Sequence, residues 1–347
     1  MSLQSLKLVA VAKDEAAYIA EWIYHHLYIG VKEIDVYLNG TEDNSFLICR
    51  RISRYYKQVN FFQADELLRV SLKTKKDFQR MIYDYAIENE KYSRRFSHLL
   101  FLDIDEYLMP ERFGNKINSL LEHNAKADVV SFLWHSDLPS MQRKAFSPVI
   151  EQSMHLKKMR QLKSMCRING AAERSKLHSF IVSKKNEKTA KFQLTDGSYP
   201  EFFHFKKRIS DEDIKRLSGR FEPWFVYHRI FRSHDEYCAS LLKGRMHRNN
   251  KLTIKDNRYG YCTNNDGVMR VCGEELTYRI YWWQFMLYRL KYEVFLWRAD
   301  LKPSIKKGQA FVAKRYKKLL KLLKKQPHLR KQYCKQFRAT RFECTID

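Results

Sequence analysis

Three carboxylates directly follow an apolar run near the middle of the first half of this chain. Residues 97–102 read SHLLFL, and Asp103, Asp105 and Glu106 come next. Two aspartates that are two positions apart at the end of a strand leave the same face of that strand. Their oxygens can bridge to one hard cation, for which Mg²⁺ or Mn²⁺ are the expected ions. Such an ion can neutralise a diphosphate leaving group. The alternative is a pair of solvated carboxylates at a loop entry.

The segments around these carboxylates alternate strand-like and helix-like patterns. Apolar runs predict strands over 6–12, 33–38, 58–62, 97–102 and 127–134, and apolar residues at helical spacing predict helices over about 15–30 and 73–92. Repeated β-α-β units predict an α/β fold, with a mainly parallel sheet and helices on both faces. Ligands of such sheets bind outside the carboxyl ends of the strands, which is where the polar clusters fall.

The carboxylate motif resembles a signature of the GT-A fold glycosyltransferases. In the family 2 and family 92-like branch this signature is F-x-D-x-D-E-F/Y-L, and the chain has FLDIDEYL over 101–108. Four further stretches between residues 6 and 245 are similar to that branch: KDEAAYIAEWIYHH (13–26), NGTEDN (39–44), DFQRMIYDYA (77–86) and YHRIFRSHDEYCASLLKGR (227–245).

The chain departs from the branch at several of these positions. Asp14 replaces an asparagine, and the 39–44 loop lacks its first aspartate. Arg229 stands where tyrosine is usual, and Arg232 stands where lysine is usual. The first half of the resemblance is therefore more specific than the second.

The resemblance implies a metal-dependent, inverting hexosyltransferase that uses a nucleotide-sugar, with a UDP-sugar as the expected donor. Its acceptor would be a surface glycan such as lipopolysaccharide or capsule. It implies a GT-A domain over 1–275, with a nucleotide-binding half over about 1–135 and an acceptor-side half over 136–275. Residues 276–347 would form a basic helical extension.

The resemblance also implies roles for individual residues, each with a structural alternative. Donor contacts are expected from Lys13, Glu15, Asn39, Asp43, Gln79, Asp103, Lys243 and Arg245, and metal ligation from Asp103, Asp105 and His228, with His204 second to His228. Asp137 and Glu173 are the candidates for the base that takes the acceptor proton. The alternatives are helix capping for Asn39 and Asp43, core packing for the histidines, solvent exposure for Lys243 and Arg245, and structural roles for Asp137 and Glu173.

Charge is the strongest feature of the composition. The 347 residues carry a formal net charge of +26, and 15 Lys or Arg against two acidic residues fall in 302–347. Such an excess favours a polyanionic partner. The amphipathic, lysine-rich segment 309–325 predicts a helix that either lies on an anionic membrane surface or packs on the core.

Other features predict a protein of the cytoplasm that lies at most on the inner face of a membrane. The seven cysteines are scattered, which suits reduced thiols, and the first residues do not resemble a signal peptide. The apolar segment 281–297 contains Arg289, Lys291 and Glu293 and is too short to span a bilayer.

Two rival functions remain open at the level of sequence. A nucleic-acid-binding protein or metal-dependent nuclease would explain the charge and the many aromatic residues, but no recognised nucleic-acid module is present. An inactive transferase fold that binds a glycan would bind nucleotide without transferring sugar.

Overall fold

A computed structural model describes residues 4–199, 209–217, 219–243, 254–263 and 271–343. The strands are β1 (Leu6–Ala12), β2 (Glu33–Leu38), β3 (Val59–Gln63), β4 (His98–Phe101), β5 (Glu106–Pro110), β6 (Val129–Asp137), β7 (Ser153–Arg167), β8 (Ala172–Ser175), β9 (Phe180–Val182), β10 (Phe192–Leu194), β11 (Trp224–His228) and β12 (Val271–Arg279). The helices are α1 (Ile19–Ile29), α2 (Ser45–Tyr55), α3 (Asp65–Thr74), α4 (Phe78–Ser93), α5 (Ile117–His123), α6 (Asp211–Arg216), α7 (His234–Leu241), α8 (Trp282–Arg298), α9 (Lys302–Lys325), α10 (His328–Gln332) and α11 (Cys334–Phe337).

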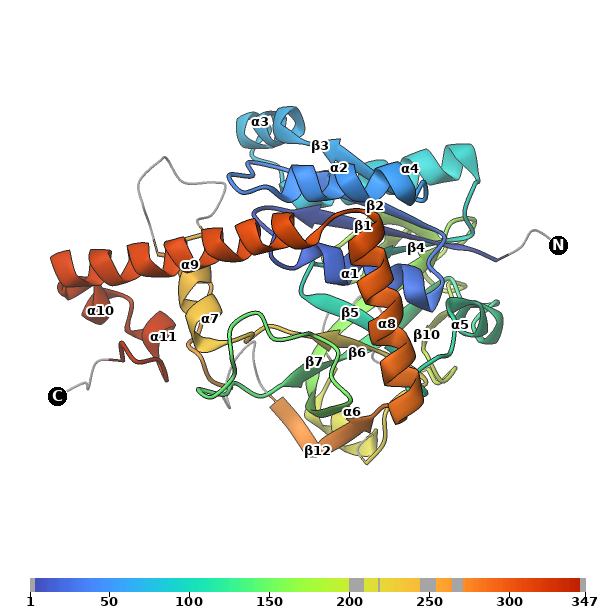
Figure 1. The fold of residues 1–347 in the computed structure, drawn as a ribbon. Helices are drawn as coiled ribbons and strands as arrows, with labels where there is room; N and C mark the ends of the chain where they lie inside the picture. The colour runs from blue at the N-terminus through green and yellow to red at the C-terminus, as the bar shows by residue number, and fades with distance from the viewer. Residues whose placement is uncertain (1–3, 200–208, 218, 244–253, 264–270, 344–347) are drawn as a thin grey trace.

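One curled sheet with helices on both faces forms the centre of the molecule (Figure 1). Its strand order is β3-β2-β1-β4-β7-β6-β11-β5, with β10 beside β6 and β12 beside β7. The first four strands are parallel, and β7 runs antiparallel to both β4 and β6. The predicted α/β class with a mainly parallel sheet is thus confirmed.

Alternation along β1 shows how the sheet separates two apolar layers. Leu8 packs into the layer that contains α1, α2 and α8, whereas its neighbour Val9 packs into the layer that contains α4. Because both faces of this strand are covered, its sequence is a continuous apolar run rather than an alternating one. The predicted bounds of β1 and β2 are correct, and Gly30 ends α1 in the left-handed conformation that glycine tolerates.

The turn between β4 and β5 corrects one argument made from the sequence. β4 ends at Phe101, and Asp103 and Asp105 lie in the turn that leads into β5. The two aspartates therefore do not leave one face of a strand, and the strand geometry expected of them is wrong.

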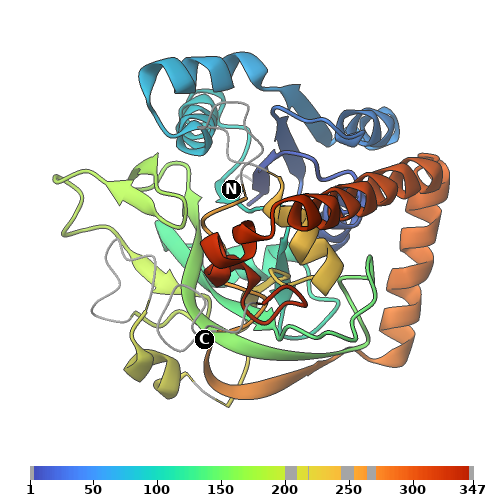
Figure 2. The same ribbon diagram turned by 90° about the vertical axis from the view of Figure 1, so that its left-hand side faces the viewer.

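The C-terminal helices pack against the sheet domain. α8 lies along the side of the molecule, and α9 begins near its end and runs off at a steep angle, so that the two helices form an L in both views (Figures 1 and 2). Val312, Leu319 and Leu323 of α9 are buried, so the packing expected for the apolar face of 309–325 is confirmed. The predicted boundary after residue 275 falls inside β12. None of the described helices is long and apolar enough to cross a membrane.

Gly308 of α9 packs closely against Ala16, in the turn that precedes α1. A Cβ atom at this position would lie 2.7 Å from the backbone carbon and the Cβ of Ala16. We expect Gly308→Ala to lower the free energy of unfolding by about 1–3 kcal/mol, because overpacking outweighs the gain in helix propensity. Urea denaturation measures this, with Lys307→Ala on the exposed face as control. Equal stability of the two variants would contradict the close packing of α9.

Candidate functional site

The carboxyl ends of the strands surround a cavity of about 350 Å³, called here the strand-end pocket. Its walls come from the segments after β1, β2, β4 and β11, the first turn of α4, the end of α7, and α9. The structure brings together in its lining most of the residues singled out from the sequence: Lys13, Glu15, Asn39, Gln79, Asp103, Asp105, His228 and Lys243. This is the sheet edge at which ligands of α/β proteins bind.

A buried lysine, Lys163 of β7, lies against the acidic turn. Its Nζ is 3.0 Å from Oε2 of Glu106 and 3.4 Å from Oδ2 of Asp103. The backbone N–H of Asp103 donates to the same Glu106 oxygen over 2.9 Å, so Glu106 orients the turn. Gln79 donates to the other Asp103 oxygen over 2.8 Å. Lys163 thus compensates the charges of Asp103 and Glu106 directly, whereas the metal ligation expected of Asp103 and Asp105 stays a prediction.

Burial governs the protonation of this cluster. Loss of water raises the pKa of Glu106 to about 7, and the charge of Lys163 opposes this rise without cancelling it. For Lys163 itself, burial lowers the pKa, but the carboxylates of Asp103 and Glu106 outweigh burial and raise it above its usual range. The lysine is thus held in its charged form.

Asp105 faces the strand-end pocket among cationic groups. Its Oδ1 is 3.7 Å from Nε2 of His228, and its side chain is 21% exposed. Burial raises the pKa of Asp105, but His228 and the guanidinium groups of Arg232 and Arg258 outweigh it and hold the pKa well below the usual range. Asp105 is therefore ionised at neutral pH.

Arg232 also lines the strand-end pocket, where it contacts Glu15 and Tyr18. Its Nη2 is 3.2 Å from Oε2 of Glu15, and its guanidinium lies 3.6 Å from the centre of the Tyr18 ring. Lys243 pairs with the other oxygen of Glu15. Arg232 and Asp14 have φ values of +46° and +50°, a region that non-glycine residues occupy rarely. Residues held in such conformations cluster at functional sites.

Reasoning from the sequence missed four cations of this pocket. Arg232 lies inside the 227–245 match, but no motif or spacing marks Lys255, Arg258 or Arg315. Arg315 reaches in from α9, where its Nη2 is 2.5 Å from Oδ2 of Asp14. Burial lowers the pKa of Lys255 to about 7, and the charges of Arg258 and Lys243 contribute to this shift.

Asp105 and His228 fit as two protein ligands of Mg²⁺ or Mn²⁺. Among the residues that the structure describes, no third His, Cys, Asp or Glu joins them to form a metal-binding group. Mg²⁺ sites in enzymes commonly take one or two carboxylates and complete their shell with substrate phosphates and water. The pair suits a metal that arrives with a diphosphate better than a preformed cage.

Several predicted site residues lie elsewhere. Asp43 accepts hydrogen bonds from the backbone N–H groups of Ala16 and Ser45, each over 2.8 Å, so it shapes the loop after β2 and does not line the pocket. Glu173 is exposed on β8, in a separate two-stranded sheet. His204 and Arg245 fall outside the described residues.

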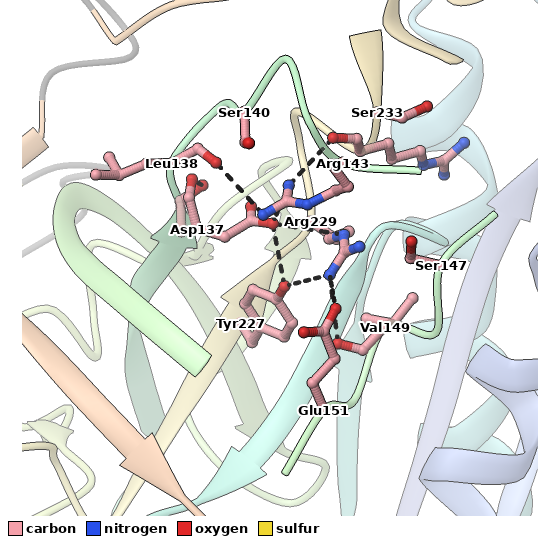
Figure 3. A network of polar contacts seen from close by, with 12 residues as sticks. Asp137, Leu138, Ser140, Arg143, Ser147, Val149, Glu151, Tyr227, Arg229 and Ser233 are labelled. Atoms are coloured by element: carbon pink, nitrogen blue, oxygen red, sulfur yellow. Dashed lines mark hydrogen bonds and ion pairs between the residues drawn. The ribbon is translucent and has the colours of Figure 1, made fainter. Parts of the chain in front are cut away.

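Asp137 belongs to a buried network next to the site (Figure 3). Its Oδ2 is 2.6 Å from Nη1 of Arg143 and 3.5 Å from Nε of Arg229, and Tyr227 donates to the same oxygen over 3.3 Å. Burial raises the pKa of Asp137, against the charges of the two arginines. Asp137 does not line the strand-end pocket, and its contacts fit a structural role.

A second cavity of about 250 Å³, called here the helix pocket, adjoins the first. It lies between α1, α8, the first turns of α9 and the loop at 146–149. Both cavities share Tyr18, Ile104, Asp105, Arg232 and Glu236 in their lining. A group bound in either cavity would thus approach Asp105.

Comparisons with known proteins establish no family. No family model matches the chain, and no curated protein matches it. Among solved structures, S. aureus TarS 1–349 in complex with UDP is 14% identical with a TM-score of 0.26, over 43% of this chain and 39% of TarS. HddC from Yersinia pseudotuberculosis is 10% identical with a TM-score of 0.31, over 54% and 88% of the two chains.

A further S. aureus TarS structure is 10% identical with a TM-score of 0.24, over 43% of this chain and 24% of that one. In both TarS comparisons the matched part is less than half of the TarS chain. TM-scores this low carry no argument about function.

Proposed function

We propose that the protein is a nucleotide-sugar-dependent glycosyltransferase and that the strand-end pocket binds the donor, with UDP-sugars as the expected class. One observation carries the proposal: strand-end segments and helices remote in sequence converge on a cavity that six Lys or Arg side chains line, and Asp105 lies there beside His228. A diphosphate needs such cations, and a carboxylate beside it can hold a divalent ion that neutralises the leaving group.

The cations of the pocket have a clear role in this reaction. Lys13, Arg232, Lys243, Lys255, Arg258 and Arg315 line the cavity, and their charges stabilise the negative charge that develops on the departing diphosphate. Arg232 and Lys243 are partly neutralised by Glu15, which also fixes their positions before the donor binds. Asp105 and His228 would hold Mg²⁺ or Mn²⁺, which supplies further neutralisation of the diphosphate when bound.

The acceptor is assigned to the helix pocket. This cavity shares Asp105 and Arg232 with the donor pocket, so an acceptor there lies next to the sugar. Arg289, Lys302 and Lys306 line it together with Glu21, Glu236 and Glu293, so the lining offers both hydrogen-bond donors and acceptors to the hydroxyl groups of a glycan. Neither base candidate from the sequence, Asp137 or Glu173, lines either pocket, and the proposal gives neither a catalytic role.

A panel of nucleotides and nucleotide-sugars tests the proposal by thermal shift, with EDTA or Mn²⁺ present. A ligand at 100 times its Kd adds about 2.7 kcal/mol of stability, which a melting curve resolves. We expect stabilisation by UDP and UDP-sugars, and release of UDP when donor and enzyme are incubated. Failure of every nucleoside diphosphate to bind, with tight and salt-sensitive binding of oligonucleotides instead, would favour the nucleic-acid alternative.

The pH dependence of donor binding gives a separate prediction. Because the pKa of Lys255 is lowered to about 7, this side chain loses its charge as pH rises through neutrality. A bound diphosphate favours the charged form, so affinity falls with rising pH, by up to about tenfold per pH unit. Titration calorimetry with a UDP-sugar measures this, since its diphosphate keeps the same charge over the range. Lys255→Arg should flatten the profile, and an unchanged slope would exclude Lys255 from the donor site.

A further inference from the structure

Helix α8 carries a continuous apolar stripe on its outer side. Trp297 is 79% exposed, Leu290 63% and Trp283 60%. Met286, Leu287 and Val294 are also exposed, and Tyr281 and Trp282 extend the stripe at the start of the helix. Positions 283, 287, 290, 294 and 297 recur at three- and four-residue spacing, so they share one face.

The opposite face of α8 is already used for packing. Tyr288, Tyr292 and Phe295 are buried, and Tyr24 of α1 lies within 5.5 Å, ring centre to ring centre, of each of them. The helix is thus apolar on both sides, and only one side is covered by the part of the chain that the structure describes. Contiguous exposed apolar patches of this kind mark interaction sites.

Cationic side chains border one edge of the stripe, and Glu293, which pairs with Lys302, lies at the other edge. Lys291 and Arg298 are exposed, and each lies one helical turn after a residue of the stripe, Leu287 and Val294 respectively. The C-terminal end of α2 lies beside the end of α8, because Tyr56 packs on Phe295 with ring centres 4.8 Å apart. That end adds the exposed Arg54 and Tyr55.

We propose that α8 docks the protein onto an anionic lipid bilayer, with its axis parallel to the surface. Tryptophan at both ends of an exposed apolar face suits the interface between headgroups and acyl chains. The bordering Lys291 and Arg298 contact lipid headgroups, and the net charge of +26 attracts the protein to an anionic surface.

Charge favours a bilayer over a second copy of the chain. Two copies that each carry a net charge of +26 repel each other, whereas an anionic lipid surface attracts each copy. The surface differs from the lysine-rich face of 309–325 that the sequence points to.

Docking through α8 has a consequence for the helix pocket. Arg289, Tyr292, Glu293 and Leu296 of the same helix line that pocket. A protein docked in this way holds the pocket beside the lipid surface, where a lipid-carried acceptor is at hand. This last step rests on the proposed function, whereas the docking itself does not.

Sedimentation with vesicles tests the proposal without any nucleotide or activity measurement. The full chain is mixed with vesicles of phosphatidylcholine alone, or of phosphatidylcholine with one third phosphatidylglycerol. We expect binding to the anionic vesicles, and a fall of at least about tenfold in the partition coefficient for the triple variant Trp283→Ser, Leu290→Ser, Trp297→Ser. Lys291→Gln with Arg298→Gln should weaken binding less, and mainly to the anionic vesicles.

The matched control changes three exposed apolar residues away from α8, Leu72→Ser, Tyr85→Ser and Tyr92→Ser, and should bind as the wild type does. Melting temperatures report whether each variant is folded. Equal binding by the α8 triple variant and the control would overturn the proposal. A wild-type dimer that the α8 variant converts to monomer, without vesicle binding by either, would assign the stripe to a second copy instead.

Discussion

Asp105→Asn is expected to lower the rate of sugar transfer by about 10²–10³-fold while leaving the fold intact. Asp105 is one of two carboxylates, with Glu236, that line both pockets. It is ionised at neutral pH, and with His228 it forms the pair that fits a divalent cation. The measurement is kcat/KM for the donor that the nucleotide panel identifies, with melting temperature as a check on folding.

UDP binding measured without metal separates the two roles that Asp105 can have, which are holding a metal ion and adding negative charge to the pocket. Asparagine removes a negative charge from among Arg232, Arg258 and His228, so UDP should bind at least as tightly as to the wild type when EDTA is present. The added affinity that Mn²⁺ gives the wild type should disappear. If Asp105→Asn weakens UDP equally with and without metal, Asp105 does not hold the ion.

Asp103→Asn is the matched control within the same motif. Gln79 donates to one oxygen of Asp103, and Lys163 pairs with the other. The side chain of Asp103 is 42% exposed. Its loss leaves Lys163 paired with Glu106, so the rate should fall less than for Asp105→Asn. Equal losses of metal-dependent affinity in both variants would support an ion shared by Asp103 and Asp105, as the sequence suggests.

Lys163→Met is expected to lower the free energy of unfolding by about 3–5 kcal/mol, the cost of leaving a buried charge without its partner. Glu106 is fully buried, and Lys163 is its ion-pair partner at 3.0 Å. Chemical denaturation at pH 8 measures the loss. Lys157→Met, a partly exposed position of the same strand, should change stability by less than about 0.5 kcal/mol.

The pH dependence of this variant follows from Glu106. Its pKa is about 7 with Lys163 present, and removal of the lysine raises it further. Between about pH 4.5 and the raised pKa, Glu106 keeps its proton in the folded variant but loses it in the unfolded chain. The free energy of unfolding therefore rises as pH falls through the raised pKa. The deficit should shrink on acidification, and Glu106→Gln in the same background should reduce it at pH 8. A deficit independent of pH would show that packing, not charge, causes it.

The positions of strands and helices were predictable where the local apolar pattern agrees with burial in the folded protein. The apolar runs of β1, β2 and β6 and the helical spacing in α1 and α4 gave elements near their observed positions because tertiary structure agrees with local pattern there. β7 was not found, although it is a central strand, because Lys158 and Lys163 interrupt its apolar pattern. Each of these lysines pairs with a buried carboxylate, Glu222 or Glu106, that lies far away in sequence.

The site was predictable only in part, for the same reason. The motif at 101–108 located Asp103, Asp105 and Glu106, but nothing local distinguishes their functions. Lys163 distinguishes them because it pairs with Asp103 and Glu106. Its position depends on strand pairing between β7 and β4. The cations Lys255 and Arg315 enter the pocket from segments that no spacing rule connects to the aspartates.

Arg315 of α9 reaches back to Asp14 beside the first strand, and Gly308 lets that helix lie against the start of α1. A ribosome must therefore translate most of the polypeptide before the strand-end pocket is complete. Until then Asp14 lacks its counter-ion, and a nascent chain released early would lack one wall of the pocket and leave the turn before α1 open to proteases.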